Sequence, residues 1–200
     1  MSATGATGRE VLSRFIREHL PMPPQDVIAA IVACFEERTL AANEYFLQAG
    51  SYSHEYMFLV TGFMRVFTLD TEGNEVTTNF ASAGAVVFEV ASFFEHTRSK
   101  ESIQALTACT GYTLPFDELN RLFHQYPEFR EFGRAILVKN FVALKQRTLS
   151  LINETAEERY AHLLQANPEI FMHAPLKHIA TYLGITDTSL SRIRKSWREK

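Results

Sequence analysis

The chain has 200 residues, of which 46% are apolar and 22% are charged, and its formal net charge at pH 7 is -3. This length suits one large domain or two small ones, and the apolar fraction is that of a globular protein with a core. No run approaches the roughly 18 apolar residues of a membrane helix, and the first nine residues lack the apolar centre of a secretory signal. We therefore expect a cytoplasmic protein of two domains that makes no contact with a membrane.

The two cysteines, Cys34 and Cys109, lie far apart, each in an apolar run. This placement predicts reduced, buried thiols rather than a disulfide or a metal site. The sequence also lacks a His-x-His motif with a carboxylate, and no group of residues forms a catalytic constellation. We expect no metal cofactor and no enzymatic activity.

Charge is distributed unevenly along the chain. Residues 173–200 hold six basic and two acidic side chains, a net charge of +4, whereas the remainder holds 14 basic and 21 acidic side chains, a net charge of −7. A small basic segment on an acidic body is typical of a nucleic-acid module joined to a module with another role. Chance clustering of solvated charge would give the same count, so charge alone leaves both interpretations open.

The first half of the chain changes from helical to strand spacing. Residues 9–20 place their apolar side chains on one helical face, and residues 23–38 repeat this spacing after two prolines, which predicts two helices. Glycine-separated runs of β-branched and aromatic residues follow at 44–50, 55–62, 63–70, 75–81 and 102–108. Gly73 suits a hairpin turn. These runs predict an antiparallel, jelly-roll-like β-roll.

Helical spacing returns after Phe116, where we expect Asp117 to cap a short helix. Beyond Pro127 an apolar seam recurs at steps of four and three, through Phe129, Phe132, Ile136, Leu137, Phe141, Leu144, Thr148 and Leu151. The seam predicts a long helix over 127–152 that pairs with its symmetry mate in a homodimer. The alternative is a helix that lies along its own roll. A capping box of Thr155 and Glu158 then predicts a hinge near 150–154.

The stretch from Pro175 to Trp197 has the spacing of a helix-turn-helix. Ala180 stands where two helices would touch, Gly184 stands at the turn, and apolar residues would close the second helix on the first: Ile179, Leu183, Ile185, Leu190 and Ile193. A generic helical hairpin shares part of this pattern. We expect Thr186 to cap the second helix, whose outward face would present Asp187, Thr188, Ser191, Arg192 and Lys195 to DNA.

Arg192 is the candidate base reader, because a guanidinium can bond both acceptors of a guanine. Asp187 would accept from a cytosine amine or only interact with the helix dipole. The candidate phosphate contacts are Lys177, Arg194, Lys195 and Arg198. The alternative for each basic residue is an ordinary solvated charge.

The order of N-terminal helices, β-roll, long helix and helix-turn-helix resembles the Crp/Fnr family of bacterial transcription regulators. The resemblance covers residues 10–197, and its motifs are "VTGFMRVF" with Gly62, "DTEGNEV", Gly84 with Glu89, "AEERYAHLLQANPEI" and "LKHIATYLGITDTSLSRIRK". It implies an α+β fold with a cyclic-nucleotide-binding-like sensor roll over 1–126, a dimerisation helix over 127–152 and a helix-turn-helix DNA-binding domain over 153–200. It also implies a homodimer on two-fold symmetric double-stranded DNA, with RNA polymerase as a further partner.

The sensor motif departs from the family pattern. Cyclic-nucleotide-binding members hold the ribose with a Gly-Glu pair and the phosphate with an Arg-Ser pair, whereas here Phe88 replaces the glycine before Glu89, and Arg98 and Ser99 lie about one residue out of register. These four residues are the candidate ligand site. A cyclic nucleotide, another small effector and no ligand all remain open, as does a purely structural Glu89–Arg98 ion pair. Two cysteines cannot supply the four thiolates of an iron-sulfur sensor.

We therefore predict a sequence-specific, homodimeric DNA-binding regulator. The rival hypothesis is a dimeric small-molecule-binding or interaction protein whose degenerate helix-turn-helix does not read DNA. The negative net charge, Asp187 and the expected lack of a two-stranded wing favour the rival, since the chain stops three residues after Trp197. Without a wing, we expect DNA binding to be weaker or to depend more on the dimer.

Overall fold

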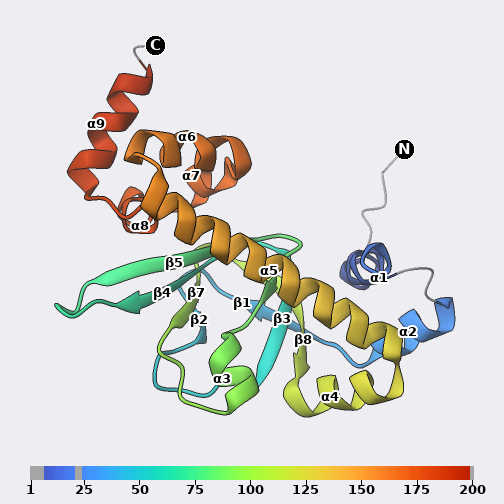
Figure 1. The fold of residues 1–200 in the computed structure, drawn as a ribbon. Coiled ribbons are helices and arrows are strands. Elements are labelled where there is room, and N and C mark those ends of the chain that lie inside the picture. Colours follow the sequence, from blue (N-terminus) through green and yellow to red (C-terminus); the bar gives the residue numbers. More distant parts are fainter. Residues whose placement is uncertain (1–6, 21–23, 199–200) are drawn as a thin grey trace.

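The computed structural model describes residues 7–20 and 24–198, and the side chain of Arg198 lies outside the described part. Figure 1 shows a β-roll, a long helix that crosses it, two N-terminal helices near one end of that helix and four further helices at the other end. The predicted α+β class, with its antiparallel roll and long helix, is confirmed.

The N-terminal helices are α1 (Gly8–Glu18) and α2 (Gln25–Ala33). Thr7 and Glu10 form a capping box at the start of α1, and the apolar face of this helix is buried, as predicted. The predicted helical span of 23–38 is wrong at its end, because α2 stops at Ala33 and Glu36 begins a strand. That strand pairs with residues 109–113, so its backbone groups are satisfied by a contact that local spacing cannot predict.

Two antiparallel four-stranded sheets form the roll, in the orders β1-β8-β3-β6 and β2-β7-β4-β5. The strands are β1 (Glu36–Leu40), β2 (Tyr45–Leu47), β3 (Glu55–Thr61), β4 (Phe63–Leu69), β5 (Glu75–Ser82), β6 (Val86–Val87), β7 (Ser102–Ala105) and β8 (Cys109–Pro115). The five predicted runs contain β2, β3, β4, β5 and β7, whereas β1, β6 and β8 were not predicted.

Glycines make the two predicted turns around β4 possible. Gly62 precedes this strand with a φ of +100°, and a Cβ there would lie 2.6 Å from the carbonyl oxygen of Ala108. Gly73 closes the β4–β5 hairpin with a φ of +87°, and its N–H donates to the carbonyl of Asp70 over 3.1 Å. Other residues rarely adopt these backbone angles, so both positions require glycine.

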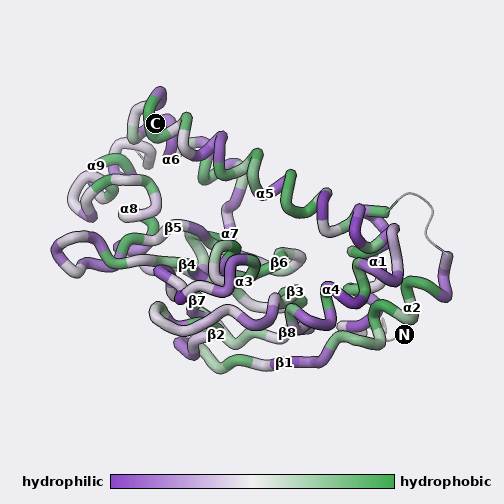
Figure 2. The backbone as a smooth tube through the Cα atoms, turned by 60° about the horizontal axis from the view of Figure 1, so that its bottom comes forward, coloured by the Kyte–Doolittle hydropathy of each residue, from purple (hydrophilic) through white to green (hydrophobic). Residues whose placement is uncertain are grey.

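Helix α3 (Val90–Glu95) lies between β6 and β7, and α4 (Phe116–Gln125) and α5 (Pro127–Asn153) follow β8. The prediction that Asp117 caps α4 is wrong, because α4 begins at Phe116 after Pro115 and Asp117 lies inside the first turn. A carboxylate there still interacts favourably with the helix dipole. The expected long helix is confirmed at 27 residues, and Figure 2 shows hydrophobic and hydrophilic turns alternating along it.

Helices α6 (Ala156–Ala166), α7 (Glu169–His173), α8 (Leu176–Tyr182) and α9 (Asp187–Arg198) form the C-terminal module. The chain leaves α5 at Glu154, and the predicted capping box of Thr155 and Glu158 starts α6. The module has its own apolar core, which also includes Phe63 from the roll. Of the two thiols, both free, Cys109 is buried as predicted and Cys34 is only half-buried.

Candidate nucleic-acid interface and sensor site

Helices α8 and α9 are joined by a tight turn built on Gly184. This glycine has a φ of +68°, and its N–H donates to the carbonyl of Thr181 over 3.1 Å. The next N–H, of Ile185, reaches back to the carbonyl of Ala180 over 3.0 Å. These two bonds are the Schellman motif that satisfies the last carbonyls of a helix. The turn therefore fixes where α9 begins relative to α8.

Thr186 caps α9, as the sequence predicts, because its hydroxyl oxygen accepts from the N–H of Ser189 over 3.2 Å. The predicted contact between the two helices is also present: Ala180 and Leu190 are fully buried, and Ile193 is 5% exposed. With Leu190 and Ile193 facing inward, the opposite face of α9 points toward solvent. The helix thus presents one face to a partner and anchors the other.

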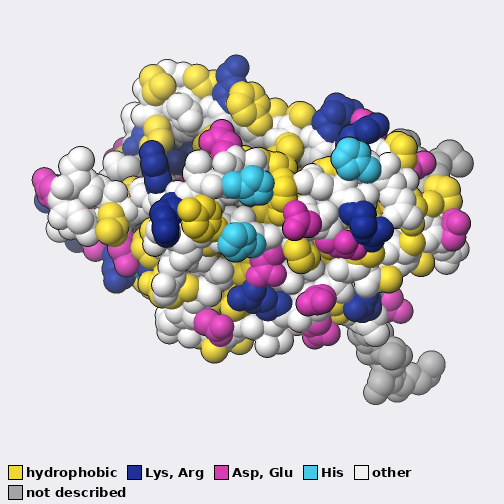
Figure 3. All heavy atoms as spheres, turned by 90° about the horizontal axis from the view of Figure 1, so that it is seen from below, with side chains coloured by type: hydrophobic (Ala, Val, Ile, Leu, Met, Phe, Trp, Pro, Cys, Tyr) yellow, Lys and Arg dark blue, Asp and Glu magenta, His cyan; other side chains and the backbone are white. Residues whose placement is uncertain are grey.

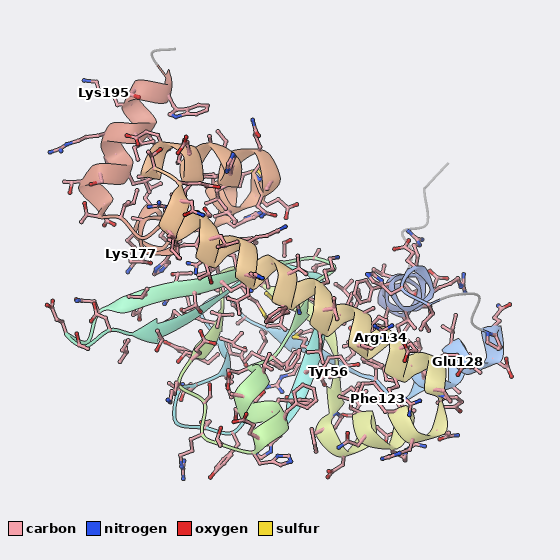
Figure 4. All side chains as sticks on the ribbon, viewed as in Figure 1. Tyr56, Phe123, Glu128, Arg134, Lys177 and Lys195 are labelled. Carbon is pink, nitrogen blue, oxygen red and sulfur yellow. The ribbon has the colours of Figure 1, made fainter. Side chains whose placement is uncertain are left out.

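Most residues proposed to contact DNA lie on α9, whereas Lys177 lies on α8 and Thr186 lies in the turn before α9. The exposed members are Lys177, Thr186, Asp187, Thr188, Ser191, Arg192 and Lys195, whereas Arg194 is half-buried. In Figure 4, Lys195 projects from the end of α9 far from the roll. Among the ion pairs of the described residues, none engages Lys177, Arg192 or Lys195. The predicted contact of Arg198 lies outside the described side chains.

Basic residues are concentrated on α9, whereas the face of the molecule seen from below carries charges of both signs. Figure 3 shows acidic, basic and histidine side chains interspersed over that face, so neither sign of charge dominates it. On α9 three basic residues, Arg192, Arg194 and Lys195, stand within four positions, with Asp187 as the acidic residue at the other end. Trp197 lies edge-on to Tyr160 with 5.8 Å between the ring centroids, so it packs within the module.

The C-terminal module is docked on the roll through a polar contact centred on Arg65. This arginine of β4 is 4% exposed, and its guanidinium donates to Nδ1 of His178 on α8 over 2.8 Å. The same guanidinium is 2.7 Å from the carboxylate of Glu75 and donates to the side-chain oxygen of Gln104. Beside it, the N–H of Thr77 donates to the hydroxyl of Thr181. We call these contacts the Arg65 contact.

Two titratable groups are shifted by the Arg65 contact. Burial, followed by the nearby Arg65 cation, lowers the pKa of His178 from its ordinary 6.5 to about 4, although Glu75 and Asp187 oppose the effect of Arg65 and Lys177. The hydrogen bond from Arg65 lowers the pKa of Glu75. His178 is therefore neutral near pH 7, which leaves Nδ1 able to accept the proton that Arg65 offers.

Two arginines tie the hinge to the carboxyl end of α8. Arg147 of α5 donates to the carbonyl of Tyr182 over 2.8 Å and lies over the ring of that tyrosine. Arg159 of α6 donates to the carbonyl of Leu183 over 3.0 Å and also to the carbonyl of Glu154. Cations stabilise helix carboxyl ends, so these bonds attach α5 and α6 to the end of α8.

The seam of α5 divides into a buried and an exposed part. Phe129, Phe132 and Ile136 are at most 7% exposed and pack on the roll. The later members Leu137, Phe141, Leu144 and Leu151 are 38%, 66%, 59% and 41% exposed; we call these four residues the exposed seam. Exposed apolar rows of this kind are typical of a surface that meets a partner.

The four residues proposed for the ligand site are engaged in contacts within the roll. Phe88 is half-buried in an aromatic cluster, 5.2 Å from Phe93 between ring centroids. Both carboxylate oxygens of Glu89 cap α3, accepting from the N–H groups of Ala91 and Ser92. The guanidinium of Arg98 donates to the carbonyl of Gly50.

Ser99 completes the proposed ligand set, but it is buried and its hydroxyl donates to the carbonyl of Glu101. The alternative of a Glu89–Arg98 ion pair is not found among the ion pairs of the described residues. A cyclic nucleotide needs free carboxylate, guanidinium and hydroxyl groups that converge on one ligand. The residues at these positions do not fit that ligand.

Comparison with known proteins decides the fold. The model of the cyclic nucleotide-binding domain matches residues 37–126. The structure of FixK2 from Bradyrhizobium japonicum superposes with a TM-score of 0.72 at 18% identity, covering 82% of this chain and 85% of that chain. The chain has the Crp/Fnr regulator fold.

Two further relatives agree with the Crp/Fnr fold. The fumarate and nitrate reduction regulatory protein of Yersinia pestis is 23% identical over 169 residues, which cover 78% of this chain and just under two thirds, 66%, of that protein. The c-di-GMP responsive regulator CLP of Xanthomonas campestris has a TM-score of 0.69 at 16% identity, covering 88% of this chain and 92% of that chain. Among the described residues, no helix has the length and hydropathy needed to cross a membrane.

Sequence reasoning missed the Arg65 contact. A buried arginine inside the apolar run "FMRVF" is the one available signal, because a buried charge requires a partner. Its partner His178 is 113 positions away, and neither segment contains a pattern that predicts contact with the other.

Proposed function

We propose that this protein is a homodimeric, sequence-specific DNA-binding transcription regulator of the cytoplasm. The outward face of α9 would enter the major groove of double-stranded DNA, and the exposed seam of α5 would pair two copies. RNA polymerase would be a further partner of such a regulator. The observation that carries the proposal is that Arg192 and Lys195 are exposed and form no ion pair with the described residues, on a helix whose start is fixed by the Gly184 turn.

In this proposal Arg192 reads a base and Lys195 neutralises phosphate. A guanidinium that makes no described ion pair keeps its fork of donors available for guanine, and Thr188 and Ser191 offer short polar groups beside it. Asp187 at the first turn is suited to the helix dipole. Lys177 and Arg194 would add phosphate contacts, as would Arg198.

The signal would travel from the roll to α9 by two routes. One route is α5 with the hydrogen bonds of Arg147 and Arg159 to the end of α8, and the other is the Arg65 contact. A ligand can change DNA binding only if it favours one arrangement of these contacts over another. We place the effector in the roll. The candidate ligand residues Phe88, Glu89, Arg98 and Ser99 are occupied by contacts within the roll, so we do not expect the effector to be a cyclic nucleotide.

The test begins with selection of a binding sequence from random duplexes, followed by anisotropy titrations at increasing salt. Because phosphate contacts release counterions, the logarithm of the affinity should fall linearly with the logarithm of the salt concentration. Affinity that does not change with salt, or no selected sequence at all, would contradict the proposal and favour an interaction protein that does not read DNA.

Variants of α9 sharpen this test. Arg192→Ala should remove about 1–3 kcal/mol of preference at one base step, whereas Lys195→Ala should weaken binding to all sequences alike. The matched control is Arg134→Ala, because Arg134 is an exposed arginine of α5 paired with Glu131 and far from α9 (Figure 4). Equal losses from all three variants would contradict the assigned roles.

A further inference from the structure

A small apolar cavity lies where β3, α3, α4 and α5 meet. Its volume is about 40 Å³, and its walls include Phe88, Phe123 and Ile136. Figure 4 shows Tyr56 of β3 and Phe123 of α4 beneath α5, on the side that faces the roll. Phe94 and Leu137 also line the cavity and are each 38% exposed, so they stand at its solvent side.

Tyr56 contributes the one polar side chain among the residues that line this cavity. The residue is 5% exposed, and its hydroxyl makes no hydrogen bond with the described residues. Buried hydroxyls in native proteins are rarely left without a partner, because an unpaired one is costly. Burial also raises the pKa of Tyr56 well above its ordinary 10, so the phenol keeps its proton and can donate it.

The chemistry of the walls restricts what can occupy the cavity. A buried water molecule needs two to four polar partners, and here it would find one. A cyclic nucleotide carries a charged phosphate and a polar ribose, for which these walls offer no cation. A molecule that is largely hydrocarbon and has one hydrogen-bond acceptor satisfies both the walls and the Tyr56 hydroxyl.

We propose that this cavity binds a small, largely apolar effector whose single oxygen or nitrogen accepts a hydrogen bond from Tyr56. The volume admits a few non-hydrogen atoms without rearrangement. A monocyclic molecule would enter by turning the side chains of Phe94 and Leu137, which are the exposed members of the lining. The site is separate from Glu89, Arg98 and Ser99, which do not line it.

The position of the cavity gives the effector a means to act, and this consequence rests on the proposed DNA-binding function. Ile136 is the last buried residue of the seam and Leu137 is the first exposed one, and both line the cavity. An effector there would contact α5 at the junction between its roll-packed and exposed parts. It would therefore bias the direction in which α5 leaves the roll.

Close packing on the α4 side limits how the cavity can adapt. A Cβ on Gly133 of α5 would lie 2.5 Å from the tip of the Phe123 ring, so the ring rests directly against the helix backbone. This wall is consequently fixed, and an effector must be accommodated by the side of the cavity formed by Phe94 and Leu137.

The experiment compares phenol, which offers an oxygen acceptor, with toluene, which has nearly the same shape and no acceptor. Calorimetric titration of the full chain should show that phenol binds more tightly than toluene. Tyr56→Phe should weaken phenol binding roughly five- to tenfold, the value of one neutral hydrogen bond, and leave toluene binding within about twofold. The control is Tyr112→Phe, because Tyr112 is a buried tyrosine of the roll outside this cavity and should not affect either titration.

A second readout does not require a ligand. Tyr56→Phe removes an unpaired buried hydroxyl, so it should raise the melting temperature of the free protein by about 2–4 °C. A melting temperature that falls, no phenol binding, or equal phenol binding by wild type and Tyr56→Phe would each overturn the inference. DNA binding is measured separately. If the wild-type chain binds DNA but not phenol, only this inference fails. If it binds phenol but no DNA, the proposed function fails.

Discussion

The roll is contacted in two places by the parts of the chain that follow it, and the two contacts are chemically different. The start of α5 packs on the roll through Phe129, Phe132 and Ile136, a contact made of hydrocarbon and aromatic rings. The second contact is made by the C-terminal module. Phe63 and Phe80 of the roll pack against the core of this module, but the centre of the contact is the hydrogen bond between the buried Arg65 and His178. Apolar packing of the first kind is part of folding, whereas a polar docking contact can have competing arrangements.

This difference predicts that the Arg65 contact opens more readily than the apolar contact at the start of α5. Between them lies the exposed seam of α5, which neither contact covers. In the proposed function, an effector can change DNA binding only if it favours one arrangement of these contacts over another. The predictions below separate the two contacts by their size and by their response to pH.

The largest effect is expected at the apolar contact. Phe129→Ala removes a fully buried ring and should lower the free energy of unfolding by about 3–5 kcal/mol, because it leaves a cavity in the core. Phe141→Ala, on the same helix but 66% exposed, should change it by less than about 1 kcal/mol at a concentration where the chain is monomeric. Urea denaturation measures both. Similar losses from the two variants would mean that Phe141 is covered within one chain.

The next effect concerns the exposed seam. Leu144→Glu places a charge in the proposed dimer interface and should raise the dissociation constant of the dimer by about thirtyfold or more, or about 2 kcal/mol. Sedimentation equilibrium measures this constant. Lys139→Glu is the control, since Lys139 is exposed and lies on the opposite side of α5 from Leu137. If Leu144→Glu does not change the dissociation constant, the exposed seam is not the dimer interface, and α5 lies only along its own roll.

A smaller effect is expected at the polar contact. Arg65→Met leaves His178 and Gln104 without their shared donor and should cost about 1–3 kcal/mol. The loss should appear as faster amide exchange in α8, while the start of α5 keeps its protection. Arg38→Met breaks the more exposed Arg38–Glu55 pair of the roll and should cost less than about 1 kcal/mol. Equal exchange in α8 and α5 would show that the two contacts open together.

The smallest effect is a dependence on pH. His178 titrates near 4 in the folded protein and near 6.5 when unfolded, so the unfolded chain binds its proton first as the pH falls. Stability from this residue is therefore present above pH 6.5 and is lost progressively between about pH 6.5 and 4. The melting temperature should fall between pH 7 and pH 5, and less so in His178→Gln, whose amide can still accept from Arg65. If the melting temperatures of wild type and His178→Gln fall by the same amount, His178 is not the cause of the pH dependence.

The sequence predicts those parts of the fold that local spacing determines. The capping box at Thr155, the turns at Gly73 and Gly184 and the burial of Ala180 follow from residues only a few positions apart. The spacing of residues 23–38 predicts helix where β1 begins, because the pairing of β1 with β8 is not visible in its own residues. The start of α4 was placed at Asp117 because a good capping residue stands one position inside a helix that needs no side-chain cap.

The candidate sites divide in the same way. The outward face of α9 follows from helical periodicity, so its exposed residues could be named in advance. The Arg65 contact and the cavity beneath α5 could not, because each brings together residues from distant elements. Phe88 shows the limit of motif reasoning: its replacement of a glycine was visible, but its place in an aromatic cluster with Phe93 was not.

The number of chains bound per duplex tests the central claim most directly. Sedimentation velocity on the selected duplex should find two protein chains per DNA molecule, one on each half of a two-fold symmetric sequence. Leu144→Glu should reduce this complex to weakly bound single chains, although it changes no residue of α9. A wild-type complex of one chain per duplex at full affinity, or full affinity in Leu144→Glu, would contradict the account.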